Sequence, residues 1–121
     1  MTHQLTQRFY FEAAHTLERE IDAAGSRRVH GHTYLAEIAI EGTPDAASGM
    51  VCDLGELRST IERVRATLDH HYLNEVEGLG KPTLENLCSY LWRAFEKTLP
   101  VAEVSVRREA SGDACRLRAS T

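Results

Sequence analysis

The apolar residues of this chain change their period twice, and these changes limit what the chain can fold into. Residues 3–15 alternate apolar and polar side chains, and a second alternation begins at His30 and runs to position 41. A period of two is typical of β-strands that bury one face. Two more alternating runs, 102–109 and 114–119, flank a Ser-Gly-Asp turn signal. The sequence therefore predicts two strands near each end of the chain.

Between the two pairs of strands, the apolar period lengthens to that of a helix. The first stripe follows Asp53, which with Glu56 resembles a capping box, and comprises Leu54, Leu57, Ile61, Val64 and Leu68. The second begins after Pro82 and Thr83, stops at Pro100, and comprises Leu84, Leu87, Leu91, Phe95 and Leu99. We therefore expect an α+β fold in which two helices pack on one face of a four-stranded antiparallel sheet. The short apolar run 50–52 is a further candidate strand.

Length and composition fit a single domain, residues 1–121. With 42% hydrophobic residues, the chain can build one core but is too short for two. Fourteen basic and eighteen acidic residues give a net charge of −4 with no basic stripe, which argues against nucleic acid as a partner. The three cysteines are odd in number and far apart, as in proteins of a reducing cytoplasm. No apolar run reaches membrane-spanning length, so we expect a soluble cytoplasmic protein.

Three histidines, His15, His30 and His32, fall on the apolar faces of the first two predicted strands where these strands approach each other in the chain. His30 and His32 are two residues apart, so their side chains point the same way, and Gly31 between them lets another backbone approach. His15 ends the neighbouring strand. Three neutral imidazoles leave a tetrahedral zinc ion with one open position, as in catalytic zinc sites. The spacing favours such a site and ordinary half-buried histidines about equally.

Two acidic residues also stand where they could act chemically. Asp69 precedes His70, and a carboxylate bonded to an imidazole fixes its tautomer and favours its charged form, which suits proton transfer. The alternative is a helix end where the histidine complements the dipole and the aspartate is solvated. Glu109 is either a solvated side chain or a carboxylate that accepts two N–H donors from a guanidine-like heterocycle.

Six stretches together resemble the 6-pyruvoyl tetrahydropterin synthase family, and within it the bacterial 6-carboxytetrahydropterin synthases of queuosine precursor synthesis. The likeness covers nearly the whole chain. The stretches are FEAAH at 11–15, RVHGHTY at 28–34, GMVCDLGELR at 49–58, LDHHYLN at 68–74, PTLEN at 82–86 and the segment around Glu109.

The resemblance implies a fold, an assembly and a set of site residues. The fold is a T-fold, whose subunits join their sheets into a trimeric barrel, and two trimers stack into a hexamer with active sites between subunits. The substrate is a small pterin, and the cofactor is Zn²⁺. The implied roles are zinc binding by His15, His30 and His32, proton relay by Asp69 and His70, a pterin pocket lined by Thr83 and Glu85, and anchoring of the pterin ring by Glu109.

Two positions depart from the family pattern. Queuosine-type enzymes carry a cysteine base four residues before the first histidine of His-Gly-His, where this chain has Ser26. An alcohol has a pKa far above the roughly 8.5 of a thiol, so serine is a poor base without help. Glu18 and Glu20 are candidate replacements for the base, and an engineered cysteine-to-serine change is a further explanation. Glu109 is out of phase with the preceding apolar alternation, and we expect a β-bulge to restore its direction.

These observations lead to one predicted function and two alternatives. The prediction is a zinc-dependent lyase that converts 7,8-dihydroneopterin triphosphate to 6-carboxy-5,6,7,8-tetrahydropterin, with Ser26 in place of the usual catalytic cysteine. The first alternative is a related enzyme with a different side-chain cleavage, one that releases 6-hydroxymethyl-dihydropterin. The second is a pterin-binding protein with little turnover.

Overall fold

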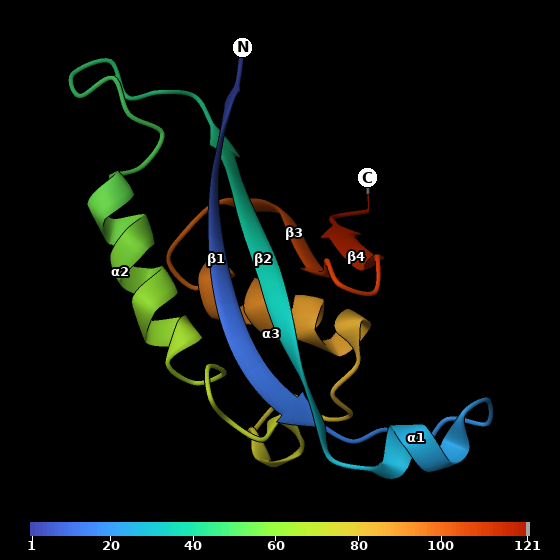
Figure 1. Ribbon diagram of the computed structural model, residues 1–121. Coiled ribbons are helices and arrows are strands. Elements are labelled where there is room, and N and C mark those ends of the chain that lie inside the picture. The colour runs from blue at the N-terminus through green and yellow to red at the C-terminus, as the bar shows by residue number, and fades with distance from the viewer. Residues whose placement is uncertain (121) are drawn as a thin grey trace.

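The computed structural model describes residues 1–120 and contains one four-stranded antiparallel sheet in the order β1-β2-β3-β4 (Figure 1). In chain order, the elements are β1 (His3–His15), α1 (Ala23–Arg27), β2 (His30–Gly42), α2 (Leu54–Arg65), the 3₁₀ turn η1 (Leu73–Glu75), α3 (Leu84–Glu96), β3 (Val101–Arg108) and β4 (Asp113–Arg118). This order confirms the predicted succession of two strands, two main helices and two strands.

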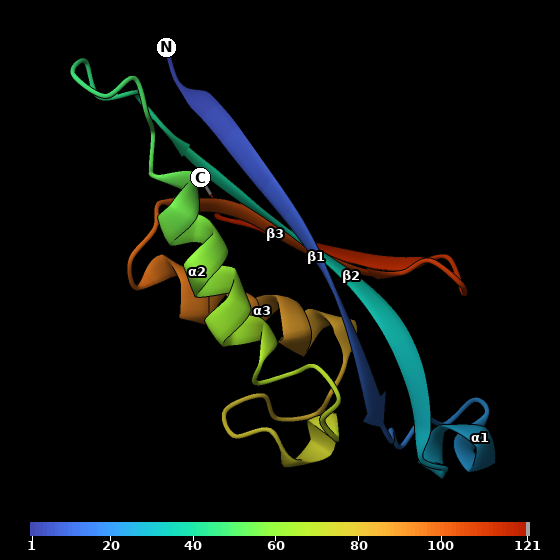
Figure 2. The same ribbon diagram turned by 60° about the vertical axis from the view of Figure 1, so that its left-hand side comes forward.

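The helices α2 and α3 cover the same face of the sheet (Figure 2). Their apolar stripes meet the inward side chains of the strands in one continuous core, whose fully buried members include Phe11, Tyr34, Ile38, Leu57, Leu91 and Phe95. Both helices begin at a side-chain cap: Asp53 accepts a hydrogen bond from the Gly55 N–H, and Thr83 accepts one from the Asn86 N–H. The predicted α+β architecture is therefore confirmed.

The pairing of β1 with β2 is what positions the histidines. Antiparallel register sets His15 opposite His30 and Ala13 opposite His32, at the end of the hairpin where the two strands separate. Residues directly opposite one another share a face of the sheet. Register therefore brings histidines 15 residues apart in the sequence onto neighbouring positions of the core-facing side.

The structure differs from the sequence expectations in three local details. Residues 50–52 lie in the loop between β2 and α2 and form no strand. The expected bulge beside Glu109 is wrong, because β3 keeps regular register with β4 up to Arg108 opposite Asp113, and Glu109 begins the connecting turn. The register shift lies instead at Ala39 and Ile40, where β2 meets β3. The short α1 and η1 segments had no clear periodic signal.

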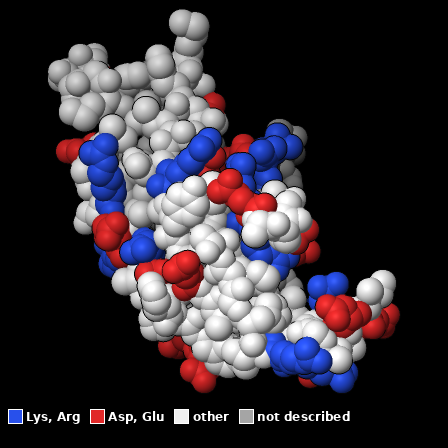
Figure 3. Space-filling model, in the orientation of Figure 1, with Lys and Arg blue, Asp and Glu red and all other residues white. Residues whose placement is uncertain are grey.

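The surface carries both signs of charge. On the face in Figure 3, acidic and basic side chains are interspersed, so neither sign gathers into one field there. Among the residues that the structure describes, no helix is both long and apolar enough to span a bilayer.

Candidate active site

His15, His30 and His32 converge on one point at the end of the β1–β2 hairpin. The Nε2 atom of His15 lies 3.0 Å from the Nε2 of His30 and 3.0 Å from the Nε2 of His32. One ring nitrogen from each of the three histidines falls within a cluster no more than 4.8 Å across. His15 is only 1% exposed, whereas the other two are half-buried, so the cluster opens toward solvent on one side.

Backbone carbonyls fix the tautomers of two of these rings. The Nδ1–H of His15 lies 3.0 Å from the carbonyl oxygen of Pro82, and that of His30 lies 2.7 Å from the carbonyl oxygen of Arg28. A carbonyl can only accept, so both Nδ1 atoms are donors, and in the neutral rings both Nε2 atoms carry lone pairs. Such carbonyl bonds to the distal ring nitrogen are usual around metal-binding histidines.

The local electrostatics keep two of the rings, those of His15 and His32, neutral. Burial, followed by the nearby Arg108 guanidinium and the other two histidines, lowers the pKa of His32 to about 4. Burial also lowers the pKa of His15, against the opposing effect of the Pro82 carbonyl. These two histidines are thus uncharged at neutral pH, which is the form that binds metals.

The donor set fits a tetrahedral zinc ion. Neutral imidazoles whose lone pairs face each other at 3.0 Å repel one another unless a proton or a cation lies between them. In tetrahedral geometry with Zn–N distances of about 2.0–2.1 Å, ligand nitrogens are about 3.3 Å apart. The two separations from His15 are close to that value, all three nitrogens lie within 4.8 Å of one another, and a set of three leaves one coordination position for substrate.

Ser26 lies in the same pocket, but its hydroxyl is committed to local structure. The pocket, of about 280 Å³, is also lined by His15, His30 and Arg108. Ser26 is 4% exposed, and its Oγ donates to the Ala23 carbonyl at 2.9 Å and accepts from the Arg19 N–H at 3.3 Å. Neither partner is a base. The geometry therefore gives this hydroxyl a role in holding the loop between β1 and α1.

Asp69 and His70 form the predicted pair. Asp69 Oδ2 lies 2.8 Å from His70 Nδ1 and 3.2 Å from the Arg65 guanidinium, while its Oδ1 accepts the backbone N–H of Glu12 at 2.8 Å. The Glu12 N–H is the main cause of the lowered pKa of Asp69, with smaller contributions from His70 and Arg65. The carboxylate is thus held ionised and in place, and it orients the His70 ring.

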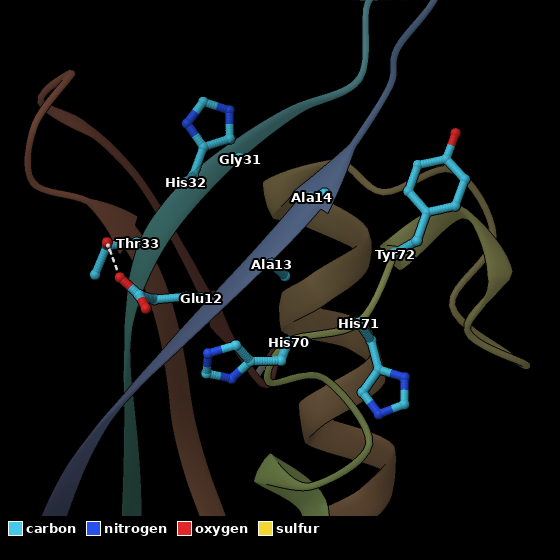
Figure 4. A pocket seen from close by; sticks show the side chains of 9 residues that line it. All are labelled: Glu12, Ala13, Ala14, Gly31, His32, Thr33, His70, His71 and Tyr72. Carbon is cyan, nitrogen blue, oxygen red and sulfur yellow. Dashed lines mark hydrogen bonds between the residues drawn. The ribbon is translucent and has the colours of Figure 1, made fainter.

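His70 has its own strained backbone and an exposed ring. Its φ of 60° lies in the left-handed region, and its N–H donates to the Glu12 carbonyl at 2.6 Å, which ties the turn to the edge of β1. The side chain is 76% exposed. His70 and His32 both line a pocket of about 520 Å³ (Figure 4), whereas Ser26 lines the other pocket. Among residues 1–120, His32 alone borders both pockets.

Thr83 and Glu85 lie at the start of α3, beside the histidine cluster. Pro82, whose carbonyl holds His15, immediately precedes them. The Thr83 hydroxyl caps α3, while the exposed Glu85 lines a groove with Arg19, Arg108 and Asp113. Because those three residues also line the Ser26 pocket, the groove and the pocket are neighbours. Glu85 thus has access to a ligand that extends from the histidines.

Glu109 is not brought to this pocket. It is exposed, and its carboxylate accepts a hydrogen bond from the Tyr10 hydroxyl at 3.3 Å. The preceding residue, Arg108, lies beside His32 instead, with Nη1 3.4 Å from His32 Nε2. Our sequence reasoning missed Arg108. Its phase with the buried Val104 and Val106 was a signal that could have found it, because residues two apart in a strand share a face.

Comparisons with known proteins find similar sequences over most of the chain. A family model described as 6-pyruvoyl tetrahydropterin synthase matches residues 4–119. The chain is 33% identical over 94 residues to a 6-carboxy-5,6,7,8-tetrahydropterin synthase of Synechocystis sp., covering 74% of this chain and 71% of the relative. It is 31% identical over 108 residues to a dihydroneopterin monophosphate aldolase of Pyrococcus furiosus, covering 89% of this chain and 87% of that protein.

Solved structures share the fold. The 6-pyruvoyl tetrahydropterin synthase of Caenorhabditis elegans superposes with a TM-score of 0.83 at 23% identity, over 99% of this chain and 97% of the other. Two strands, two helices and two strands therefore form the same T-fold in both proteins, as the sequence motifs implied.

Proposed function

Because the chain belongs to the 6-pyruvoyl tetrahydropterin synthase family, we propose that it is a metal-dependent enzyme that cleaves a carbon–carbon bond in the side chain of a dihydropterin. The observation that carries this proposal is the convergence of three Nε2 atoms, two of them held as acceptors by backbone carbonyls. The metal we propose is Zn²⁺, held by His15, His30 and His32. Bound there, it would act as a Lewis acid toward oxygen atoms of the pterin side chain.

Ser26 bears on which bond-breaking route the site supports. The route to a 6-carboxy product requires a base that removes protons from carbon atoms of the substrate side chain. The Ser26 hydroxyl is a poor candidate for this base, because it is already hydrogen-bonded to the Ala23 carbonyl and the Arg19 N–H. An aldol-type cleavage begins at a hydroxyl, whose proton is more acidic than one on carbon. The C1′–C2′ bond then breaks to give an aldehyde, and the electron pair left on C1′ is delocalised into the ring and takes up a proton. The products are 6-hydroxymethyl-dihydropterin and a two-carbon aldehyde.

We propose that His70 exchanges these protons and that Asp69 orients it. The pair meets the requirements of a general acid–base group, because Asp69 is anchored by the Glu12 N–H and the imidazole is open to solvent. Glu85 lines the groove in which the ring would lie, and Thr83 caps the helix that carries it. The ring-anchoring role of Glu109 stays a prediction, which requires a pterin that reaches the Tyr10 side of the sheet.

The second candidate is the conversion of 7,8-dihydroneopterin triphosphate to 6-carboxy-5,6,7,8-tetrahydropterin, as in queuosine precursor synthesis. The identity to the Synechocystis enzyme favours it. In this case Glu18 or Glu20, in the loop before Ser26, would have to supply the base. A cytoplasmic location suits either reaction, because both use reduced pterins.

One experiment separates these functions. Zinc-loaded protein is incubated with 7,8-dihydroneopterin, its monophosphate and its triphosphate, and the products are identified by mass. We expect 6-hydroxymethyl-dihydropterin. A 6-carboxy product would select the second candidate, whereas tight pterin binding without turnover would leave a binding protein. Absence of both binding and turnover would refute the proposal.

We also propose that the active unit is a hexamer, a dimer of trimers. The strands β1 and β4 are the edges of the sheet, and joining them between subunits would satisfy the backbone groups that a monomer leaves open. A stable monomer in light scattering at micromolar concentration would contradict this assembly.

A further inference from the structure

We propose that Arg108 binds an oxyanion, a phosphate or carboxylate carried by the side chain of the substrate, next to the three-histidine cluster. This inference rests on the proposed function, because it names the substrate chemistry of the same site. It assigns to Arg108 the role of selecting substrates by charge.

The fold delivers this guanidinium to the pocket. In β3, Val104 and Val106 are fully buried on the core-facing side, and Arg108 is the next residue in that phase. Its side chain is only 19% exposed. A buried cation is costly unless anions or acceptors surround it, so an arginine at the end of an apolar face requires partners.

The partners within the chain leave part of the guanidinium unused. Nη2 lies 2.9 Å from the Asp113 carboxylate across the β3–β4 pair, and the Ser111 hydroxyl donates to the same Asp113 oxygen. The Nε atom of Arg108 is buried and has no hydrogen-bond partner. One carboxylate therefore binds one end of the guanidinium, while Nη1 at the other end faces the histidine cluster.

The remaining nitrogen contact cannot persist when a metal is bound. Arg108 Nη1 lies 3.4 Å from His32 Nε2, the lone pair that our proposal gives to zinc. The lone pair cannot bind zinc and accept a hydrogen bond from Arg108 at the same time. A guanidinium beside a divalent cation is also repelled by the charge of that cation. An oxyanion in the pocket resolves the conflict, because it accepts from the freed nitrogens and lies between two positive charges.

A second unsatisfied group points to the same place. The Tyr34 hydroxyl is buried without a hydrogen-bond partner, and the Tyr34 ring lies 5.7 Å from the His32 ring between centroids. The Arg108 guanidinium lies close to this hydroxyl as well. Tyr34 and Arg108 are thus neighbours whose hydrogen-bonding groups the folded chain does not fully satisfy, as expected beside a site for a polar ligand.

The test compares non-reacting, oxidised pterins that differ in charge. Affinities of neopterin, neopterin monophosphate and 6-carboxypterin are measured by fluorescence with wild-type protein, Arg108→Met and Arg107→Met, all matched in zinc content. Arg107 is the matched control, because it lies one residue away in β3 and faces Glu37 at 3.9 Å. Arg108→Lys tests whether charge without the planar fork is enough.

We expect wild-type protein to bind at least one of the two anionic pterins about 10- to 100-fold more tightly than neopterin. Arg108→Met should reduce that preference to less than about threefold, since one charge-assisted contact accounts for it. Arg107→Met should retain it, and the affinity for neopterin should stay the same in both. The ligand whose affinity falls identifies the oxyanion. An unchanged preference in Arg108→Met overturns the proposal.

The outcome also distinguishes this inference from the proposed function. If wild-type protein binds pterins without preference for charge, the proposed function stands and the role of Arg108 fails. If it binds no pterin, the proposed function fails. Arg108 is then tested with inorganic triphosphate alone, whose binding should be lost in Arg108→Met and kept in Arg107→Met, and equal binding by both overturns the inference.

Discussion

Replacing Ser26 with alanine should destabilise the protein and leave its catalysis almost unchanged. The hydroxyl donates to the Ala23 carbonyl at 2.9 Å and accepts the Arg19 N–H at 3.3 Å, in a site that is 4% exposed. Each such hydrogen bond contributes about 0.5–1.5 kcal/mol, so the loss of both should cost about 1–3 kcal/mol. In a domain of this size, that lowers Tm by about 3–15 °C.

The assay combines thermal unfolding with steady-state turnover of the product-forming pterin substrate, at matched zinc content. Ser59→Ala is the control, because Ser59 is exposed on α2 and its change should move Tm by less than about 2 °C. We expect kcat/KM of Ser26→Ala to stay within about twofold of wild type, because a hydroxyl bonded to the Ala23 carbonyl has no base to activate it.

One result would refute this reasoning. If Ser26→Ala keeps its Tm but loses activity by about 100-fold or more, the hydroxyl takes part in the reaction. Its hydrogen bonds to Ala23 and Arg19 would then contribute little to stability. Ser26→Cys provides a complementary measurement. A thiol has a much lower pKa than an alcohol, so this variant should raise formation of the 6-carboxy product by at least about tenfold.

Three further predictions follow from the site. His30→Ala should reduce bound zinc from about one ion per chain to well below half, measured by elemental analysis, whereas His71→Ala should not; stoichiometric zinc in the first variant would rule out the assigned ligands. Zinc-free protein should lose stability as pH falls from 7 to 5, because the pKa of His32 is lowered to about 4 in the folded chain, so that the unfolded chain takes up a proton at higher pH, from about 6.5 downward. Urea unfolding at several pH values should show this loss in wild type and a smaller loss in His32→Gln. An equal dependence on pH in both proteins would exclude His32 as the cause. Asp69→Asn should lower kcat by about 100-fold or more while zinc content and KM change little, and an unchanged pH–rate profile would show that the pair does not carry the proton.

The sequence by itself determined the scaffold and the composition of the three-histidine cluster. The period of two fixes the direction in which each side chain leaves its own strand, so His15, His30 and His32 could be assigned to one face without coordinates. The helical stripes and their caps at Asp53 and Thr83 were equally readable, because they depend on neighbours within a few residues. The family motifs then named the fold.

The tertiary structure decided which groups each side chain meets. Pro82, 67 residues from His15, supplies the carbonyl that orients its ring, and no periodicity in either segment encodes that contact. The same holds for Ser26, whose hydroxyl is bonded to Ala23 and Arg19, and for the pocket position that Arg108 occupies while Glu109 turns outward. Local patterns set directions relative to one backbone. Hydrogen-bond partners, burial and protonation depend on which distant segments pack beside it, and those become fixed only when the chain has folded.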